Sequence, residues 1–569
     1  MKNKSIEKLN PFLSFITVFE NGKSEINTPD INMYEMVKIS AEANPNAIAL
    51  EYFGKTFTYK KLIERIKAAA SSYAFLGVKS GDIVTIIMAN TPEAIISIYA
   101  LNSLGAICNI LHPLSSVKEI MQSLVSVKSR VLLTMDFCYE RIKPAISETH
   151  LKNAVVVSAA DSMGFLMKSA FSLKQHNSVL EKDDDIAVSW SSFIKSGKKI
   201  NFETAKNKEA VILHSGGTTG TPKEIVLSNS NFNSFSIQSV ATLRNIKVGD
   251  KVLAILPIFH GFGLGVCIHV TLCFGACAVL VPKFNAKNFG NLIKKYKPTM
   301  VYGVPTLYEA MLSAKGLEKL NFSFLKYAIS GGDFLPPVLE ERVNDFFKNH
   351  ESNIKISEGY GLTESLAAVC LSVNDNYKKG SIGKPLVGNE FCIVDPETDC
   401  SVQPGEVGEI CINGPTVMLG YRNNEIETAN ALKIHSDGKT WLHTGDMGMV
   451  DDEGFVFYKS RRKRLIISSG YNIYPRNVEN VIEQLCYVEK CVVVGIPHPY
   501  KKEVAKAYIV LKNGVEPCES IKQRIKHHCA DSLAYFSIPY EYEFVKSLPT
   551  TPLGKIDFVK LANFNSSAE

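Results

Sequence analysis

Ten residues of this chain combine the groups that proteins use to hold phosphate. Residues 214–223 read His-Ser-Gly-Gly-Thr-Thr-Gly-Thr-Pro-Lys and directly follow the apolar, strand-like run 211–213. Glycines let backbone N–H groups approach an oxyanion closely, hydroxyl groups donate hydrogen bonds to phosphate oxygens, and a lysine adds a mobile positive charge. The segment therefore predicts a phosphate-binding loop. Its candidate ligands are Ser215, Gly216, Gly217, Thr218, Thr219, Gly220 and Lys223.

Two other interpretations of this segment are weaker. A P-loop requires a Gly-Lys-Ser/Thr sequence that runs into a helix, whereas here Thr221 and Pro222 separate Gly220 from Lys223. A surface linker has a similar Gly/Ser/Thr composition, but this segment ends in Pro-Lys and lies between apolar runs. Phosphate binding is therefore the favoured interpretation.

A second motif supplies an aromatic ring, a hydroxyl group and a carboxylate. Residues 359–364 read Gly-Tyr-Gly-Leu-Thr-Glu. Tyr360 offers a flat face for a base, Thr363 a hydrogen bond to phosphate, and Glu364 a hard oxygen ligand for Mg²⁺. The plainer alternative is a turn before a helix, with Thr363 as its N-cap. The order and spacing of this motif after the first loop favour the nucleotide interpretation.

A third motif ends in a carboxylate that suits a ribose. Residues 441–446 read Trp-Leu-His-Thr-Gly-Asp. A carboxylate such as that of Asp446 can accept hydrogen bonds from both ribose hydroxyls, as acidic residues do in dinucleotide sites. The plainer alternative is a Thr-Gly-Asp hairpin turn. Together the three motifs predict one ATP site assembled from distant parts of the chain.

In this order, the motifs resemble those of the adenylate-forming superfamily, which includes acyl- and aryl-CoA ligases, peptide-synthetase adenylation domains and luciferases. The resemblance covers roughly residues 33 to 562. It implies that ATP and Mg²⁺ convert a carboxylic acid to acyl-AMP, and that a thiol then takes the acyl group. Such chemistry depends on positioning and charge neutralisation more than on covalent catalysis.

The resemblance also assigns roles to individual residues. Asp446 and Arg461 would hold the ribose, Tyr360 would stack on adenine, Thr363 would contact the α-phosphate, and Glu364 would bind magnesium. These roles follow from the match to the family motifs and are expectations for this chain.

Two C-terminal loops would serve different half-reactions. Lys555, in the segment 549–556, would bridge the substrate carboxylate and the phosphate during adenylation. Gly470, in the segment 468–475, would help to form the tunnel for the thiol after the small domain rotates about a hinge at Lys463.

The segment 257–263, Pro-Ile-Phe-His-Gly-Phe-Gly, resembles the substrate-pocket motif of the family. Amino-acid-activating relatives place an aspartate where this chain has His260, so an amino-acid substrate is disfavoured. The alternative for His260 is an ordinary core histidine. An aliphatic or aryl acid fits the apolar surroundings. Coenzyme A is the favoured thiol, and an acyl carrier protein is the alternative acceptor.

Three positions depart from the family pattern. Glu224 follows the loop lysine, where a small residue is usual, and either weakens the attraction for triphosphate or points to solvent. Ser460 precedes Arg461 in place of glycine, and Leu553 precedes Gly554. None of these changes removes a charged catalytic group.

Alternating apolar runs and helical stretches must position these motifs. Strand-like runs at 83–88, 131–134, 154–157, 251–257, 276–281, 299–304 and 324–330 alternate with helical segments near 92–104, 262–274, 286–296, 305–314 and 336–348. This pattern predicts an α/β fold with parallel sheets covered by helices. The polar stretch 182–208 reads as a surface excursion.

The domain organisation follows from changes in this alternation of strand-like and helical segments. We expect an N-terminal extension at 1–32, a large AMP-binding domain at 33–462 with a β-rich subdomain at about 391–458, and a small mobile α+β cap domain at 463–569.

Composition limits the class of protein. The 569 residues carry a formal net charge of +6 without a basic stripe, so nucleic acid is not an expected partner. No apolar signal core follows the N-terminal lysines, and the run 252–281 is too interrupted to cross a membrane. The 13 scattered cysteines suit a reducing, cytoplasmic location. Zinc at His269, Cys273 and Cys277 is disfavoured, because free cysteine is ordinarily a buried hydrophobe.

Four functions remain for this fold. The favoured one is an AMP-forming acyl-CoA synthetase. The alternatives are an acyl-AMP ligase that loads a carrier protein, a nucleotide-binding pseudoenzyme with a regulatory role, and a luciferase-like oxygenase. Retention of Glu364, Asp446, Arg461 and Lys555 argues against the pseudoenzyme, and no residue indicates oxygen chemistry.

Overall fold

The first large sheet is built around six parallel strands. The computed structural model describes residues 11–18, 24–164, 167, 184–197, 204–215, 223–469, 471–550 and 556–563. The eight-stranded sheet has the order β21-β11-β10-β6-β5-β7-β8-β9. These strands are β5 Ile83–Ile87, β6 Ile107–Ile110, β7 Val131–Met135, β8 Asn153–Val157, β9 Ala187–Ser189, β10 Glu209–His214, β11 Glu224–Ser228 and β21 Gly420–Tyr421. The pairs from β10 through β6, β5, β7 and β8 to β9 are parallel, whereas β11 pairs antiparallel with both β10 and β21.

The second large sheet has nine strands in the order β18-β17-β16-β15-β14-β12-β13-β3-β4. Its pairs from β16 through β3 are parallel. These strands are β3 Ile48–Tyr52, β4 Lys55–Thr58, β12 Lys251–Ala254, β13 Cys277–Leu280, β14 Met300–Gly303, β15 Tyr327–Gly331, β16 Ile356–Gly361, β17 Ala368–Leu371 and β18 Lys384–Pro385. The predicted alternation of strands and helices, and the parallel sheets that it implied, are confirmed.

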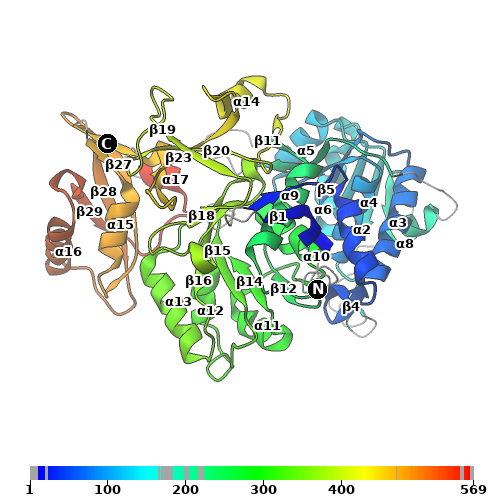
Figure 1. Cartoon of the computed structure of the whole chain (residues 1–569), viewed down its shortest axis with the longest axis horizontal. Coiled ribbons are helices and arrows are strands. Elements are labelled where there is room, and N and C mark those ends of the chain that lie inside the picture. Colours follow the sequence, from blue (N-terminus) through cyan, green and yellow to red (C-terminus); the bar gives the residue numbers. More distant parts are fainter. Residues whose placement is uncertain are drawn as a thin grey trace.

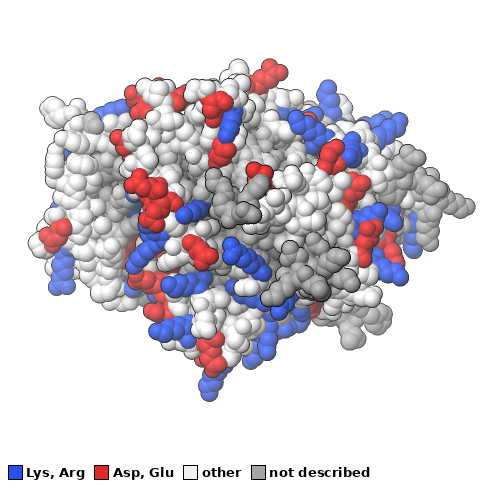
Figure 2. Space-filling view, in the orientation of Figure 1, with Lys and Arg blue, Asp and Glu red and all other residues white. Residues whose placement is uncertain are grey.

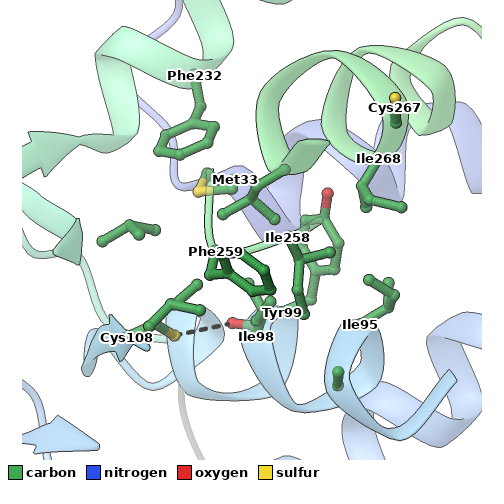
Figure 3. Packing of buried hydrophobic residues seen from close by; sticks show 14 of the residues in the cluster. Met33, Ile95, Ile98, Tyr99, Cys108, Phe232, Ile258, Phe259, Cys267 and Ile268 are labelled. Atoms are coloured by element: carbon green, nitrogen blue, oxygen red, sulfur yellow. Dashed lines mark hydrogen bonds between the residues drawn. The ribbon is translucent and has the colours of Figure 1, made fainter. Parts of the chain in front are cut away.

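Buried helices join the two large sheets into one core. Helix α4, Pro92–Ser103, is buried along its whole length, as expected for a helix that is apolar on every face. It contacts α2 and α3, and α2 in turn contacts α9 and α10. Figure 3 shows Ile95, Ile98 and Tyr99 of α4 packed with Met33 and Phe232. Burying each such side chain contributes about 1.5–3 kcal/mol.

The remaining helices lie between or outside the sheets. They are α2 Met33–Ala43, α3 Tyr59–Phe75, α5 Val117–Ser126, α6 Asp136–Ile142, α8 Trp190–Ser196, α9 Asn229–Thr242, the π-helix η3 Phe262–Val270, α10 Thr271–Cys273, α11 Phe289–Tyr296, α12 Pro305–Leu312, α13 Pro337–Asn349 and α14 Glu425–Ala431. The π-helix begins within the predicted substrate-pocket motif, at Phe262, and π-helical turns are frequent at functional sites.

A third sheet follows, in the region that the sequence analysis predicted to be rich in β-strands. It contains β19 Glu390–Val394, β20 Gly408–Asn413, β22 Leu432–Ile434, β23 Thr440–Val450 and β24 Val456–Arg461. Strand β23 is the longest of them and pairs with β20, β22 and β24. In Figure 1 this sheet lies between the large sheets and the C-terminal part of the chain.

The C-terminal part is a separate sheet with helices on both faces. It contains β25 Ile466–Ser468, β26 Tyr471–Ile473, β27 Val488–His498, β28 Lys502–Leu511 and β29 Glu541–Phe544, with α15 Pro475–Glu483, α16 Glu519–Ser532 and α17 Phe558–Asn563. Because side chains alternate along a strand, Cys491 and Val493 of β27 pack with α15 and α16, whereas Val492 and Val494 pack with Leu561 of α17. The small C-terminal domain expected from the sequence is present (Figure 1).

The structure corrects one local prediction and excludes two of the alternatives. The stretch 182–208 is more than a surface excursion, because β9 extends the first sheet and α8 packs on α3. Residues 359–361 end a strand, and Thr363 begins a short 3-10 turn rather than capping a helix. The motif 441–446 lies within β23 and not in a hairpin turn.

The apolar run 252–281 folds as predicted, into a strand, a helical segment and a second strand. Among the described residues, no helix has both the length and the apolar character needed to traverse a bilayer. On the face seen in Figure 2, acidic and basic side chains are interspersed.

Candidate active site

The predicted phosphate loop closes a β-hairpin of the first sheet. His214 of β10 pairs with Glu224 of β11. At the base of the loop, Ser215 N–H donates to the carbonyl of Lys223 at 3.0 Å, and Lys223 N–H donates to Ser215 Oγ at 3.0 Å. These bonds hold the two ends of the loop together. Gly216, Gly217, Thr218, Thr219 and Gly220 lie outside the described residues.

The ammonium group of Lys223 already has two partners. It forms an ion pair with Glu427 of α14 and lies 4.6 Å from the ring centroid of Tyr421. Tyr421 Oη donates to Glu364 Oε1 at 2.9 Å, and burial raises the pKa of Tyr421. The second motif is thereby connected to the base of the phosphate loop. Tyr421 and Glu427 were missed by the sequence analysis, because no motif or spacing marks them.

Glu224 does not point to solvent, which corrects one of the two alternatives for this residue. One of its carboxylate oxygens is buried and accepts no hydrogen bond among the described residues. Burial raises the pKa of Glu224, while Ser126 and the charge of Arg422 act in the opposite direction.

The second motif runs along the end of β16 into the turn Thr363–Ser365. A Cβ atom at Gly361 would lie 1.6 Å from the carbonyl oxygen of Ala367, so only glycine fits this close approach. The carbonyl of Glu364 accepts a hydrogen bond from Met418 N–H at 2.8 Å, which fixes the backbone beneath its carboxylate.

Tyr360, Asp446 and Arg461 form one cluster. Tyr360 Oη donates to Asp446 Oδ2 at 2.7 Å, and Arg461 Nε lies 3.0 Å from Asp446 Oδ1. Asp446 is 1% exposed, and its Oδ1 accepts no hydrogen bond of good geometry among the described residues. Burial raises the pKa of Asp446 against the effect of Arg461 and Tyr360, and the charge of Glu364 adds to the increase. The second and third motifs therefore share one polar centre.

A bulge in β23 aims Asp446 at this centre. Cys411 of β20 pairs with His443, whereas Glu409 pairs with Met447, so β23 contains extra residues between these two pairs. Gly445 has φ +70° there, and its N–H donates to Glu409 Oε1 at 2.8 Å. Glu409 is a further residue that the sequence did not reveal.

His260 lies beside the second motif. Its backbone N–H donates to Pro257 O at 3.1 Å, and its ring lies 5.0 Å from that of Phe259. A Cβ atom on the adjacent Gly261 would lie 1.6 Å from Leu366 O, so the backbones of the pocket motif and the 363–366 turn are in contact. His260 is half-buried, and its role at the site stays a prediction.

Aromatic rings and glycines pack against one another around Phe262, two residues after His260. The Phe262 ring lies 6.5 Å from that of Tyr302, and a Cβ atom at Gly331 would lie 3.2 Å from the Phe262 ring. Ser330 Oγ is buried and has no hydrogen-bond partner among the described residues. The side chains around Phe262 are mostly apolar, and their role as a substrate pocket stays a prediction.

Lys555 and Gly470 lie outside the described residues, but their flanks are placed. Thr550 and Ile556 form an antiparallel bridge that closes the loop carrying Lys555. Phe558 packs under Arg464, whose guanidinium lies 3.8 Å from the ring centroid. The loop base therefore adjoins the turn Arg462–Arg464, which contains the predicted hinge residue Lys463.

Comparisons with known proteins agree with this geometry. The model of the AMP-binding enzyme family matches residues 37–422, and that of the AMP-binding enzyme C-terminal domain matches residues 477–555. The chain is 31% identical to a long-chain-fatty-acid–CoA ligase of Bacillus subtilis (strain 168) over 94% of both chains. It is 29% identical to a probable 4-coumarate–CoA ligase of Dictyostelium discoideum over 90% of this chain and 91% of that one.

Solved structures with the same fold cover almost the whole chain. The anthranilate CoA ligase AuaEII in complex with anthranoyl-AMP superposes with a TM-score of 0.81 at 25% identity, over 95% of this chain and 98% of that one. ATP-bound MatB from Rhodopseudomonas palustris gives a TM-score of 0.80 at 24% identity, over 94% and 99% of the two chains, and supports the fold alone.

Proposed function

Since the chain belongs to the AMP-binding enzyme family and is an acid–thiol ligase, we propose that it converts a fatty or other aliphatic or aryl acid to its acyl-CoA through acyl-AMP. The observation that carries the proposal is the cluster of Tyr360, the buried Asp446 and the more exposed Arg461, near enough to Glu364 for its charge to raise the pKa of Asp446. It gathers two motifs that are 77 or more residues apart in the chain.

In the first half-reaction, a carboxylate oxygen attacks the α-phosphorus of ATP, and pyrophosphate leaves. We assign the ribose to Asp446, whose buried Oδ1 accepts no hydrogen bond of good geometry among the described residues, and to Arg461. Tyr360 would lie against the adenine. The phosphates would lie between Thr363 and the loop 215–223, where Lys223 would exchange Glu427 for a phosphate oxygen.

The residues present fit a magnesium ion. Glu364 uses one oxygen to accept from Tyr421, which leaves carboxylate oxygen available for a hard cation beside the phosphate loop. When bound, Mg²⁺ would neutralise charge on the phosphates. Lys555 would then balance the charge that the substrate carboxylate and the α-phosphate bring together.

In the second half-reaction, the thiol of CoA attacks the acyl carbonyl carbon, and AMP leaves. We propose that the segment with Gly470 lines the thiol path after the domain 463–569 rotates against 33–462, with 1–32 as an extension. The hinge at Lys463 falls in the turn between β24 and β25. The names of the curated relatives support CoA as acceptor over a carrier protein.

The lining favours an apolar acid. Phe262 and Tyr302 offer aromatic rings and Gly331 offers backbone, and none of the three supplies a carboxylate that could bind the amine of an amino acid. His260 would lie at the entrance of the proposed acid pocket. The relatives named for long-chain fatty acids support a fatty acid, whereas AuaEII supports an aryl acid.

We retain the cytoplasm as the proposed location, because all 13 cysteines are free thiols.

Pyrophosphate release across a panel of aliphatic and aryl acids, with and without CoA, tests the proposal. Acid-dependent release together with consumption of CoA thiol is the expected result. Accumulation of acyl-AMP until a carrier protein is added would replace CoA by that acceptor. Absence of release with every acid, despite ATP binding, would contradict the proposal.

A further inference from the structure

Three soft metal ligands converge on the β-rich sheet, away from the nucleotide cluster. The Cys411 thiol, the His435 imidazole and the His443 imidazole each offer one atom, and these atoms all lie within 4.8 Å of one another. The two Nε2 atoms are 2.9 Å apart. Ligands of a tetrahedral zinc ion at 2.0–2.3 Å lie roughly 3.3–3.6 Å from one another, so small side-chain movements would suffice.

The backbone brings these residues together. Cys411 and His443 are directly opposite each other on the antiparallel strands β20 and β23, so their side chains share one face. His435 follows β22, and its N–H donates to Lys439 O at 3.1 Å, which closes the hairpin into β23. The His435 ring stacks on Trp441 at 5.5 Å with an interplanar angle of 18°, and this contact fixes its direction.

A buried carboxylate orients one of the imidazoles. Glu409 Oε2 lies 3.3 Å from His443 Nδ1, and both side chains are 5% exposed. When His443 Nδ1–H donates to this carboxylate, Nε2 keeps its lone pair and faces His435. Carboxylate–histidine pairs of this kind support the ligands of zinc sites.

Among the described residues, the two imidazoles hydrogen-bond to each other, and the other polar side chains nearby have partners of their own. Cys392 of β19 is opposite Cys411, but its thiol lies 3.3 Å from Ser401 Oγ. Asp399 lies 3.9 Å from His443 Nδ1 and forms an ion pair with Lys433 at 2.7 Å. One thiolate with two imidazoles is a donor set that suits zinc better than magnesium or calcium.

We propose that Cys411, His435 and His443 bind a zinc ion, with Glu409 orienting His443 and a water molecule as the fourth ligand. The same Glu409 accepts from Gly445 N–H in the bulge that carries Asp446. Zinc would therefore brace the strand that presents the ribose-binding carboxylate. The site is separate from the magnesium site proposed at Glu364.

Titration of the full chain with Co²⁺ and Zn²⁺, after treatment with a chelator and without ATP, tests this site. Co²⁺ should produce a thiolate-to-cobalt charge-transfer band that saturates at about one ion per chain and disappears when Zn²⁺ displaces it. Cys411→Ser should abolish the band. His435→Gln should weaken zinc affinity at least about tenfold, the order seen when zinc coordination is impaired.

Two matched variants serve as controls. Cys400→Ser removes an exposed thiol, and His527→Gln removes an exposed imidazole beside Asp531 on α16. Both should retain the band, the affinity and the rise in Tm on adding zinc. Because Cys411 is buried and its variant can fail to fold, the half-exposed His435 gives the independent test. No charge-transfer band in the wild type, or unchanged zinc affinity in His435→Gln, would overturn the proposal.

Discussion

At the scale of single residues, the cluster around Asp446 depends on a charge that burial disfavours. Tyr360 donates a hydrogen bond to the Asp446 carboxylate and Arg461 forms an ion pair with it, although burial raises the pKa of Asp446. Ribose hydroxyls would satisfy the buried Oδ1. A hydrogen bond to a charged group contributes about 1.5–3 kcal/mol, so this carboxylate is the sharpest single-residue test of the nucleotide site.

We expect Asp446→Asn to lower kcat/KM for ATP by about 10- to 150-fold, which corresponds to that free energy. The amide has the same shape but loses the charge that faces Arg461 and one acceptor for a ribose hydroxyl. Pyrophosphate release as a function of ATP concentration measures the effect. Asp452→Asn, at an exposed turn, should leave kcat/KM unchanged. Equal effects of the two substitutions would exclude the ribose role.

Much of this residue set was predictable from the sequence. Tyr360, Glu364, Asp446 and Arg461 belong to motifs whose side-chain types match a nucleotide, and the structure gathers them. Tyr421, Glu427 and Glu409 were not predictable, because they act through contacts across 57, 204 and 36 positions respectively. Tertiary contacts of that length leave no local pattern.

At the scale of elements, a bulge decides where the third motif points. The sequence Thr-Gly-Asp suggests a turn, yet these residues lie within an 11-residue strand that pairs on both sides. Turn propensity was overridden because β20 and β24 supply the backbone partners. Gly445 absorbs the extra length with its left-handed backbone.

We expect Gly445→Ala to reduce ATP usage more than stability. A Cβ atom at Gly445 meets nothing within 4 Å, so the substitution costs only the strain of φ +70°, about 1–2 kcal/mol. The strained bulge should relax and turn Asp446 away, raising KM for ATP. Gly454→Ala is the control, since it has φ +80° and equally open space in the β23–β24 turn. Both variants should lose similar Tm, and a rise in KM shared by both would contradict the role of the bulge.

Glu358 of strand β16 predicts that the stability of the folded chain depends on pH. Burial raises the pKa of Glu358 from 4.5 to about 8, against the Leu335 N–H bond and the charge of Arg476. The folded chain therefore holds a proton that the unfolded chain releases above pH 4.5. This contribution to stability is complete below pH 4.5 and is lost as the pH rises through about 8.

Glu358→Gln should flatten that dependence, because the amide stays neutral while it still accepts from Leu335. Thermal unfolding at about pH 5.5 and about pH 8.5 measures it, and the fall in Tm between the two should be smaller in the variant than in the wild type. The Tm of the control variant Glu397→Gln, at an exposed position, should fall between the two pH values as much as the Tm of the wild type does. A fall in Glu358→Gln as large as in the wild type would refute the assignment.

At the scale of the whole molecule, a cation–π contact joins α15 of the C-terminal part to the segment between β15 and α13. Arg476 of α15 stacks over Phe334 at 4.2 Å, and it pairs with Glu479 within its own helix. Such a contact is compatible with rotation about the turn Arg462–Arg464. The alternation of strands and helices revealed the sheets in advance, but no local pattern revealed this contact.

The proposed rotation of residues 463–569 predicts that the two half-reactions can be separated by a single substitution. Lys555→Ala should reduce acyl-AMP formation by about 10²- to 10³-fold, comparable to a lost oxyanion donor, because the carboxylate and phosphate charges are no longer balanced. Thioester formation from supplied acyl-AMP and CoA should stay close to wild type, since Lys555 would then lie away from the site. Lys560→Ala, on the exposed face of α17, keeps the same tail and should affect neither step. Equal loss of both steps in Lys555→Ala would mean that the lysine acts in one fixed position, and the rotation would no longer be needed to explain how one site serves ATP and then CoA.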